Sequence, residues 1–179
     1  MDSNQKYFLK TERLGFGIWR ENDIGLATSL WGDKEVTKYI ANSISQQDIK
    51  DRLRKEIDTF QKYGMQYFPV FSLETNDHIG CCGLWPYKIE EELYELGYHL
   101  KPAYWGRGYA TEAAKTMIVY AFDVLKINKL FARHHPDNNA SKNVLLKSGF
   151  QYKQDDFFAP TGLYHLSYQL DKNNWIKGK

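Results

Sequence analysis

Residues 104–112 read Tyr104-Trp105-Gly106-Arg107-Gly108-Tyr109-Ala110-Thr111-Glu112, between a predicted strand and a predicted helix. Gly106 and Gly108 lack a Cβ atom, so a phosphate can approach the backbone amides closely. The first amides of the following helix have no partner within the helix, and the helix dipole adds positive potential there. Together these features predict an anion site suited to a pyrophosphate, with the charge of Arg107 at its rim.

Other interpretations of the glycine pair are open at this point. A tight loop whose glycines only permit a turn explains Gly-x-Gly equally well. The dinucleotide-binding fingerprint fails, because its third glycine would fall at Thr111. The phosphate loop of nucleotide hydrolases also fails, because no Gly-Lys-Ser/Thr follows at the required spacing. A nucleotide-binding domain is therefore a disfavoured alternative, which a comparison of CoA binding with ATP and NAD binding would decide.

The patterns on either side of this loop predict one α/β domain over residues 1–179, with its core at 9–175. Before the loop we expect a strand at 14–19, helices that begin after Asp23 and Ser45, and strands at 67–73, 78–85 and 93–100. After it we expect a helix from Ala110 to Leu125, a strand at 129–134, a short helix at 138–148 and a hairpin of 150–158 with 163–170. This order predicts a mixed central sheet of about seven strands, flanked by about four helices.

Composition excludes several classes of protein. Of the 179 residues, 42% are apolar and 16% aromatic, which is typical of a globular chain. Lysine and arginine number 24 against 22 acidic residues, and they form no basic block, so we expect no nucleic-acid partner. The two cysteines, Cys81 and Cys82, are adjacent and cannot form a relaxed disulfide, which favours reduced thiols in a cytoplasmic protein. No apolar run suits a signal peptide or a membrane span, so we expect no membrane partner.

Several stretches resemble the GNAT superfamily of acetyl-CoA-dependent N-acetyltransferases, whose glycine motif is Arg/Gln-x-x-Gly-x-Gly/Ala. Gly108 and Ala110 match its last two positions. Trp105 occupies the first, as in the branch of ribosomal-protein alanine N-acetyltransferase-like enzymes. The further stretches that resemble this branch are Thr11-Glu12-Arg13-Leu14, Glu95-Leu96-Gly97-Tyr98 running into Pro102-x-x-Trp105-Gly106, Asn138-x-Ala140-Ser141-x-x-Val144-Leu145-x-Lys147-x-Gly149-Phe150, and Tyr168 to Trp175. The match runs in order from Thr11 to Trp175, and one departure is Leu146, where the branch often has Glu.

The resemblance implies an enzyme that moves an acetyl group from acetyl-CoA, its cosubstrate, to a primary amine such as a protein N-terminus, a polyamine or another small amine. It also implies a sheet that splays between the strand near Leu96 and the strand near Phe131, with acetyl-pantetheine in the gap. The residues that would bind the cofactor are then Tyr98, Leu100 and Asn138 for the pantetheine arm, and Trp105, Gly106, Arg107, Gly108, Tyr109, Ala110 and Thr111 for the pyrophosphate. A catalytically silent acyl-CoA-binding module on the same fold is the alternative, and the retained Glu95 favours the enzyme.

Acyl transfer from a thioester requires a neutral amine, a donor for the oxyanion and often a proton for the thiolate. Glu95 is the candidate base, because it lies mid-strand beside the implied splay. Strand alternation alone favours a solvent-facing carboxylate, as for nearby Glu90 to Glu92, whereas the branch pattern favours the base. His99 shares the face of Glu95 and is a second candidate for base or relay, although a surface histidine is the commoner case.

Asn138 and Ser141 head the predicted short helix, where N-capping alone would explain both residue types. The resemblance adds a pantetheine contact for Asn138 and a proton donor near the sulfur for Ser141. A backbone amide near Leu96 to Tyr98 is the expected oxyanion donor. His134 and His135 would point to opposite faces of a strand, so we predict no metal site.

No motif identifies the acceptor amine. The aromatic residues Tyr39, Tyr63, Tyr67, Trp85 and Tyr87 could line its pocket, but core packing explains them equally well. We expect acceptor contacts on the two early helices and on the loops after Gly64 and Trp85. A homodimer is also left open by the sequence.

Overall fold

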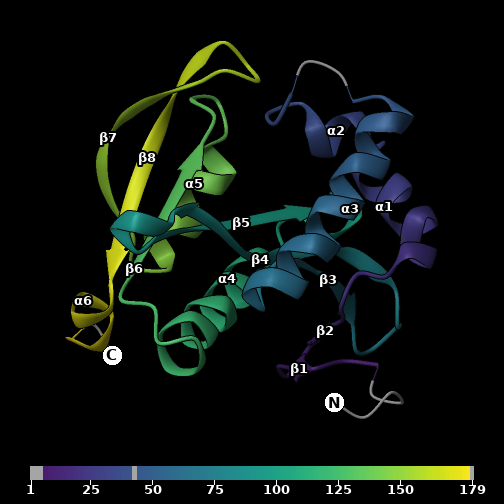
Figure 1. Cartoon of the computed structure of the whole chain (residues 1–179), viewed down its shortest axis with the longest axis horizontal. Helices are drawn as coiled ribbons and strands as arrows, with labels where there is room; N and C mark the ends of the chain where they lie inside the picture. Colours follow the sequence, from purple (N-terminus) through teal and green to yellow (C-terminus); the bar gives the residue numbers. More distant parts are fainter. Residues whose placement is uncertain (1–5, 42–43, 178–179) are drawn as a thin grey trace.

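The computed structural model describes residues 6–41 and 44–177. Within these residues one mixed sheet of eight strands runs in the order β1-β2-β3-β4-β5-β6-β8-β7 (Figure 1). The strands are Leu9–Lys10 (β1), Leu14–Phe16 (β2), Tyr67–Ser72 (β3), His78–Lys88 (β4), Leu93–Leu100 (β5), Lys129–His134 (β6), Gln151–Phe158 (β7) and Leu163–Asp171 (β8). The helices are Ile24–Trp31 (α1), Lys34–Thr37 (α2), Gln46–Tyr63 (α3), Tyr109–Val119 (α4), Asn139–Lys147 (α5) and Lys172–Lys177 (α6). The predicted α/β class and mixed sheet are confirmed.

The two halves of the sheet separate between β5 and β6, which form its parallel pair. The parallel register covers only Leu93 to Glu95 on β5, opposite Lys129 to Phe131 on β6. Beyond these residues β5 continues to pair with β4, while β6 continues to pair with β8. Figure 1 shows the consequence, because β7 and β8 rise on one side while β3 and β4 lie on the other. The predicted splay between Leu96 and Phe131 is therefore confirmed.

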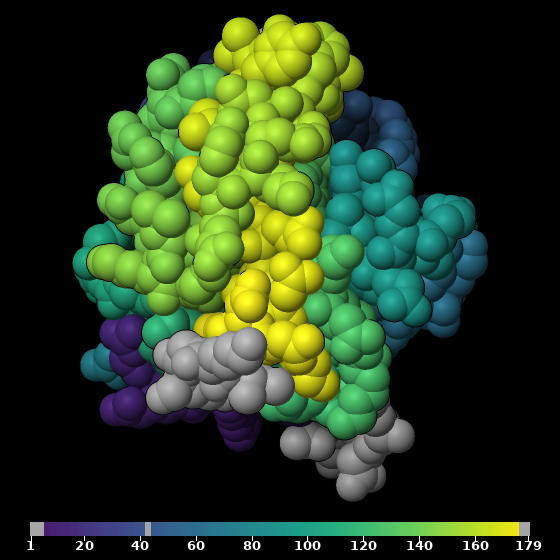
Figure 2. All heavy atoms as spheres, turned by 90° about the vertical axis from the view of Figure 1, so that its left-hand side faces the viewer, coloured from purple at the N-terminus to yellow at the C-terminus, as the bar shows by residue number. Residues whose placement is uncertain are grey.

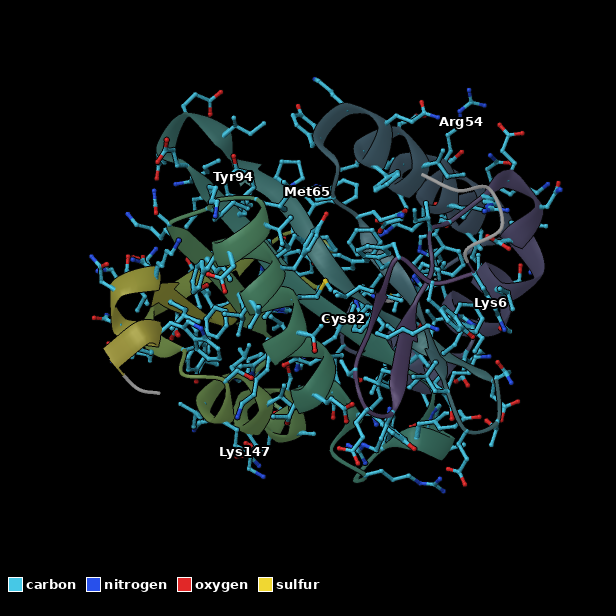
Figure 3. The ribbon with its side chains drawn as sticks, turned by 90° about the horizontal axis from the view of Figure 1, so that it is seen from below. Lys6, Arg54, Met65, Cys82, Tyr94 and Lys147 are labelled. Atoms are coloured by element: carbon cyan, nitrogen blue, oxygen red, sulfur yellow. The ribbon has the colours of Figure 1, made fainter. Side chains whose placement is uncertain are left out.

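Helices cover both faces of the sheet. Helix α4 presents Ala113, Ala114 and Met117 to one face, all fully buried, and the small alanines let the helix approach closely. Helices α1 and α3 cover the opposite face in a second cluster that includes Cys81. Because neighbouring strand residues point to opposite faces, Cys82 instead lies in the layer beneath α4, as Figure 3 shows from below. Both cysteines are free, as expected, and both are buried.

The long helix α3 is set by local signals at both ends. The Ser45 hydroxyl accepts from the Asp48 amide at 3.1 Å, and the Asp48 carboxylate accepts from the Ser45 amide at 2.8 Å. This reciprocal capping box satisfies two of the amides that a helix start leaves free. Gly64 ends the helix in the left-handed region, with φ of +69°. The predicted start of this helix after Ser45 is confirmed.

The structure adds elements that the sequence did not predict. Strand β1 has two residues and helix α2 has four, so neither is long enough to show a periodic pattern. The predicted helix to Leu125 is α-helical only to Val119 and continues as a π-helical turn over Tyr120–Val124. The predicted strand at 14–19 ends at Phe16. No helix in the described part of the chain has the length and apolar character to cross a bilayer.

Strand β7 forms one edge of the sheet, and Figure 2 shows the face that β7 and β8 present to solvent. Most of β7 is exposed. Its charged residues include Lys153, Asp155 and Asp156, which disfavour pairing with the strands of other molecules.

Candidate active site

A cavity of about 750 Å³ opens where the sheet splays. Its walls come from β5, β6, α2, α3, α5 and the glycine loop before α4. The predicted site residues that line it are Glu95, Tyr98, Leu100, Trp105, Gly106, Gly108, Tyr109, Ala110, Thr111, Asn138 and Ser141. The structure therefore brings together almost the whole predicted set, and Arg107 is the exception.

Strand β5 turns one row of backbone groups into the splay. The Lys101 amide donates to the Ile79 carbonyl at 2.9 Å, so this pair is hydrogen-bonded toward β4. In an antiparallel ladder such pairs alternate with pairs whose backbone groups point away from the neighbouring strand. The register is unbroken from Leu100 to Glu95. Tyr98 and Leu100 therefore direct their N–H and C=O groups into the gap, on the edge that β6 has left. Leu96 directs only its C=O group there, because its amide belongs to the last parallel bridge, between Glu95 and Phe131.

The glycine loop presents a row of free amides at the start of α4. Gly106 and Gly108 have φ of +72° and +80°, a region that favours glycine. The first amide of α4 that bonds within the chain is Glu112, which donates to the Gly108 carbonyl at 3.0 Å. Among the residues described here, no acceptor is found for the amides of residues 106–111. This row, together with the helix dipole, has the properties of an anion site.

Trp105 departs from its predicted role. Its amide donates to the Pro102 carbonyl at 3.1 Å within a tight turn, so it is not among the free amides. Its indole Nε1 donates to the Leu100 carbonyl at 2.7 Å, which occupies one of the acceptor positions on β5. Trp105 therefore ties the glycine loop to β5, while the row of free amides begins at Gly106.

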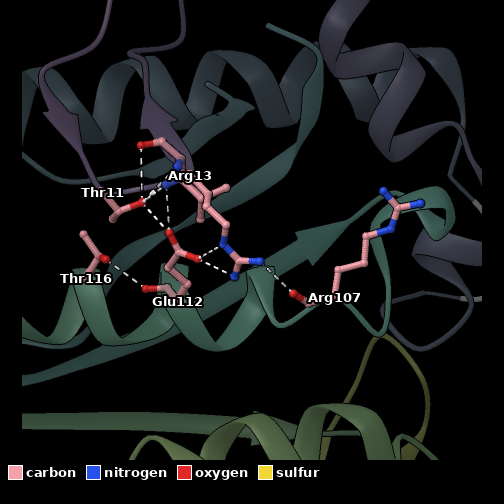
Figure 4. Close-up of polar contacts among 6 residues, drawn as sticks. Thr11, Arg13, Arg107, Glu112 and Thr116 are labelled. Carbon is pink, nitrogen blue, oxygen red and sulfur yellow. Dashed lines mark hydrogen bonds and ion pairs between the residues drawn. The ribbon is translucent and has the colours of Figure 1, made fainter. Parts of the chain in front are cut away.

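Arg13 braces the glycine loop from the segment between β1 and β2 (Figure 4). Its Nη1 donates to the Arg107 carbonyl at 3.1 Å, and its Nε donates to Glu112 at 2.7 Å. The guanidinium also lies 4.6 Å from the centre of the Tyr109 ring. Thr11 donates to the other oxygen of Glu112 at 2.5 Å. The loop and the first turn of α4 are thus held by residues about a hundred positions earlier in the chain.

The Arg107 side chain does not line the cavity. Figure 4 shows it extending away from the cluster around Glu112, and its guanidinium lies 6.0 Å from the centre of the Tyr104 ring. The backbone of Arg107 belongs to the loop, and the role of its charge at the rim stays a prediction.

The head of α5 meets β5 across the splay. The Asn138 side chain accepts from the Ser141 amide at 3.0 Å, which is the expected N-cap. The Tyr98 hydroxyl donates to the Ser141 carbonyl at 3.1 Å and lies 2.9 Å from the Ser141 hydroxyl. Burial raises the pKa of Tyr98, so its phenol keeps its proton at neutral pH. The sequence suggested only the backbone of Tyr98, whereas its side chain is also part of the site.

Glu95 forms an ion pair with Arg133, whose Nε lies 3.2 Å from the carboxylate. The two side chains are only 20% and 13% exposed, whereas Glu90 to Glu92 are exposed. The Arg133 guanidinium also lies against the rings of Phe131 and Phe158, 5.0 and 4.9 Å from their centres. Glu95 is therefore not a solvent-facing strand carboxylate. No spacing in the sequence signalled Arg133, because its role depends on how β6 lies beside β5.

His99 is held as a neutral imidazole. Its Nδ1 lies 3.1 Å from the Trp31 indole Nε1, which donates to it, and this hydrogen bond assigns the imidazole proton to Nε2. Burial, with the nearby charge of Arg52, lowers the pKa of His99 to about 3. An imidazole with such a low pKa is a weak proton acceptor at neutral pH, which argues against His99 as the base.

The end of the cavity away from the glycine loop is formed by α3, β3, β4 and β5. Arg52 on α3 pairs with the fully buried Glu56 at 2.7 Å, and Glu56 also accepts from the Tyr67 amide at 2.8 Å. The Tyr67 hydroxyl packs onto Gly97, where a Cβ would collide with it. Of the candidate aromatics, Tyr39, Tyr67 and Trp85 line the cavity, whereas Tyr63 and Tyr87 do not. The sequence identified the aromatics but not Arg52, whose spacing matches any exposed helix residue.

Comparisons with known proteins agree with this geometry. The family model described as an acetyltransferase (GNAT) domain matches residues 13–151. An uncharacterized N-acetyltransferase, p20, from Bacillus licheniformis is 32% identical over 147 residues, which cover 80% of this chain and 82% of the relative. A GNAT-family acetyltransferase from Bacillus anthracis superposes with a TM-score of 0.78 at 24% identity, covering 92% of this chain and 98% of that one.

A ribosomal L7/L12 alpha-N-protein acetyltransferase, solved in complex with coenzyme A, superposes with a TM-score of 0.77 at 14% identity. The match covers 90% of this chain and 95% of the other. The chain therefore belongs to the GNAT acetyltransferase family and is an acetyl-CoA-dependent N-acetyltransferase.

Proposed function

We propose that this chain acetylates a primary amine by direct attack of the amine on the thioester of acetyl-CoA, bound across the splay. The observation that carries the proposal is the row of free amides at residues 106–111, which opens into the cavity. These amides would hold the pyrophosphate, since several N–H donors and a helix dipole converge there. The site needs no side-chain charge from Arg107.

The pantetheine arm would lie along the free edge of β5. Its amide groups can exchange hydrogen bonds with the Tyr98 carbonyl and with the Leu100 amide. The Leu100 carbonyl already accepts from Trp105 at 2.7 Å, so it is the weaker candidate for the arm. Asn138 would contribute a side-chain contact from the head of α5, in addition to its capping role.

Glu95 would act as the general base. A free alkyl ammonium has a pKa of about 10, so the acceptor must lose a proton before it attacks. The ion pair with Arg133 holds the Glu95 carboxylate beside the last parallel pair of β5 and β6, where the splay begins. In this position Glu95 would take the proton from the amine, directly or through one water molecule.

Collapse of the tetrahedral intermediate requires an oxyanion donor and a proton for sulfur. The outward amide of Tyr98 would stabilise the oxyanion. As the C=O bond re-forms and the C–S bond breaks, the Ser141 hydroxyl would protonate the departing thiolate. The Tyr98 hydroxyl lies 2.9 Å from Ser141 Oγ and could return a proton to it.

The test is release of free thiol from acetyl-CoA in the presence of a panel of primary amines. We expect at least one amine to accelerate thiol release and to be recovered in acetylated form by mass spectrometry. CoA binding without thiol release for any amine would instead support a silent acyl-CoA-binding module. Binding of ATP or NAD in preference to CoA would overturn the assignment of the glycine loop.

A further inference from the structure

Arg52 has a feature that the chemistry above does not use. Its Nε donates to Glu56 at 2.7 Å, and its guanidinium lies 5.4, 5.1 and 5.5 Å from the ring centres of Trp31, Tyr67 and Trp85. The side chain lines the cavity and keeps 33% of its surface exposed. In the described part of the chain, no acceptor is found for its two terminal nitrogens. A guanidinium fixed by one carboxylate and three rings therefore keeps one edge free.

This free edge matches a specific kind of ligand. Two terminal nitrogens of a planar guanidinium can bind both oxygens of a carboxylate in parallel, which a lysine ammonium cannot do. The ion pair with Glu56 uses only the Nε atom of Arg52. The edge formed by its two terminal nitrogens therefore has no function in that ion pair. The three aromatic rings restrict the plane of the guanidinium, which lowers the entropy that a ligand would lose on binding.

The charges around Arg52 disfavour a polycationic acceptor. Glu56 and Glu95 are already paired, with Arg52 and Arg133 respectively, and His99 is neutral. The other carboxylates in the described lining are Glu35, which pairs at 3.2 Å with Lys38 just after α2, and Asp137, which lies on the loop before α5. A second ammonium placed beside Arg52 would meet its guanidinium, while the neighbouring carboxylates of Glu56 and Glu95 are already paired.

Arg52 is also connected to the reacting part of the cavity. Its guanidinium lies against the Tyr67 ring, and the Tyr67 hydroxyl packs onto Gly97. Gly97 directly precedes Tyr98, whose amide is the proposed oxyanion donor. Trp85, another of the three rings, is the cross-strand partner of Glu95. When Arg52 binds one group of a small molecule, the rest of that molecule therefore lies beside Glu95.

We propose that Arg52 binds a carboxylate of the acceptor, so that the acceptor is an amine that also carries a carboxylate, as a free amino acid does. This inference rests on the proposed function and adds the substrate class. Arg52 is then a specificity-determining residue, and the aromatic rings accommodate the apolar part of the acceptor.

The experiment compares matched acceptors in the thiol-release assay. Leucine, phenylalanine and methionine are each tested against their carboxamides and against the amines that lack the carboxylate, with spermidine as a polycation. We expect kcat/KM for the best amino acid to exceed that of its carboxamide by roughly 10–100-fold, as for hydrogen bonds between charged groups. Arg52→Lys should abolish this preference and leave the stabilisation by CoA unchanged.

Two further variants control for folding. In the double variant Arg52→Gln/Glu56→Gln no buried carboxylate is left without a partner, and the preference should again be lost. Arg54 is exposed on the same helix, and Figure 3 shows it at the surface, so Arg54→Gln should keep the preference. Equal kcat/KM for amino acids and carboxamides, a better rate with spermidine, or a preference that survives Arg52→Lys would overturn the proposal.

A binding measurement makes the result independent of turnover. In the presence of CoA, the shift in melting temperature is measured with N-acetyl-phenylalanine and with its carboxamide. A larger shift for the acid, lost in Arg52→Lys, supports the carboxylate site, and equal shifts contradict it. If no amine releases thiol while this difference persists, the proposed acetyl transfer fails and the Arg52 site stands.

Discussion

The two ends of the cavity are built in different ways. The end at the glycine loop consists of backbone amides at consecutive positions, residues 106–111, and its geometry follows from two glycines and a helix start. The end that we propose binds the acceptor consists of the side chains of Arg52, Tyr67, Trp85 and Glu95, which come from α3, β3, β4 and β5. A site made of backbone can be recognised in a short stretch of sequence, whereas a site made of dispersed side chains requires the fold.

This difference also predicts separable effects. Substitutions at the acceptor end should change turnover and selectivity while CoA binding persists. Substitutions around the glycine loop should change CoA affinity while the chemistry at saturating acetyl-CoA persists. Substitutions of Glu95, Arg13, Asn138 and Gly108 test this separation.

The largest effect is expected from Glu95→Gln. Glutamine keeps the size of the side chain and can still accept a hydrogen bond from Arg133, but it cannot take the proton of the amine. Turnover should fall by roughly 10²–10⁴-fold, with little change in the stabilisation by CoA. The exposed neighbour provides a control, because Glu90→Gln should retain activity.

The deficit of Glu95→Gln should shrink at high pH, where the free amine forms without assistance. Rates are measured for both forms from about pH 6 to 10, a range that includes the titration of alkyl amines. Equal turnover across this range would return Glu95 to a purely structural role in the ion pair with Arg133.

Arg13→Gln should weaken CoA binding without changing the chemistry. The substitution removes the donor to the Arg107 carbonyl and the ion pair with Glu112. The Kd for CoA should rise by about tenfold, the equivalent of roughly one charge-assisted hydrogen bond, while kcat at saturating acetyl-CoA stays near the parent value. Lys115 is exposed on α4, so Lys115→Gln serves as the control. A fall in kcat without a change in the Kd for CoA would show that Arg13 affects the chemical step and not CoA binding.

Asn138→Ala should have two smaller effects at once. Losing the N-cap of α5 should cost about 1 kcal/mol of unfolding free energy, and losing a pantetheine contact should raise the Kd for CoA by a few fold. Ser45 caps α3 in the same way but lies outside the cavity, so Ser45→Ala should lower stability alone. If the two variants lose stability alike and both bind CoA normally, Asn138 is only a cap.

A loss of stability in acid is also expected, and it concerns the fold rather than the two ends of the cavity. Burial lowers the pKa of His78 to about 4 and, with the charge of Arg52, that of His99 to about 3. In the unfolded chain both imidazoles have the ordinary histidine pKa of about 6.5 and become protonated below that pH, whereas in the folded chain they stay neutral. The free energy of unfolding is therefore highest above about pH 6.5 and decreases as the pH falls toward 4. Melting temperatures between pH 7.5 and 4.5 should show a smaller decline in His78→Gln and in His99→Gln than in the parent. Identical declines in all three proteins would rule out these two histidines as the source.

Much of the fold was predictable because its signals are local. The bounds of β5 and β6, Leu93–Leu100 and Lys129–His134, agree with the prediction at both ends. Alternating and apolar strand patterns reveal such elements, and Ser45 with Asp48 reveals the start of α3. The two-residue strand β1 and the π-helical turn over Tyr120–Val124 carry no pattern of their own, because packing decides them.

The site was predictable to the extent that backbone forms it. The glycine pair indicated the free amides, but it did not reveal that the tight turn at Pro102–Tyr104 uses the Trp105 amide. The partners of Arg13, Arg52 and Arg133 depend on which elements lie side by side. Arg133 and Glu95 are 38 positions apart, and Arg13 and Glu112 are 99 apart, so no spacing rule could pair them.

The most direct measurement of the central claim is the CoA affinity of Gly108→Val and Gly162→Val, determined by isothermal titration calorimetry on folded protein. Both glycines have positive φ, +80° and +70°, so both variants carry comparable backbone strain. A Cβ at Gly162 meets nothing within 4 Å, and Gly162 lies in the β7–β8 hairpin outside the cavity. We expect Gly162→Val to bind CoA as the parent does and Gly108→Val to bind it about 100-fold more weakly or not at all, since several charge-assisted hydrogen bonds are lost. A folded Gly108→Val variant that binds CoA with normal affinity would contradict the account.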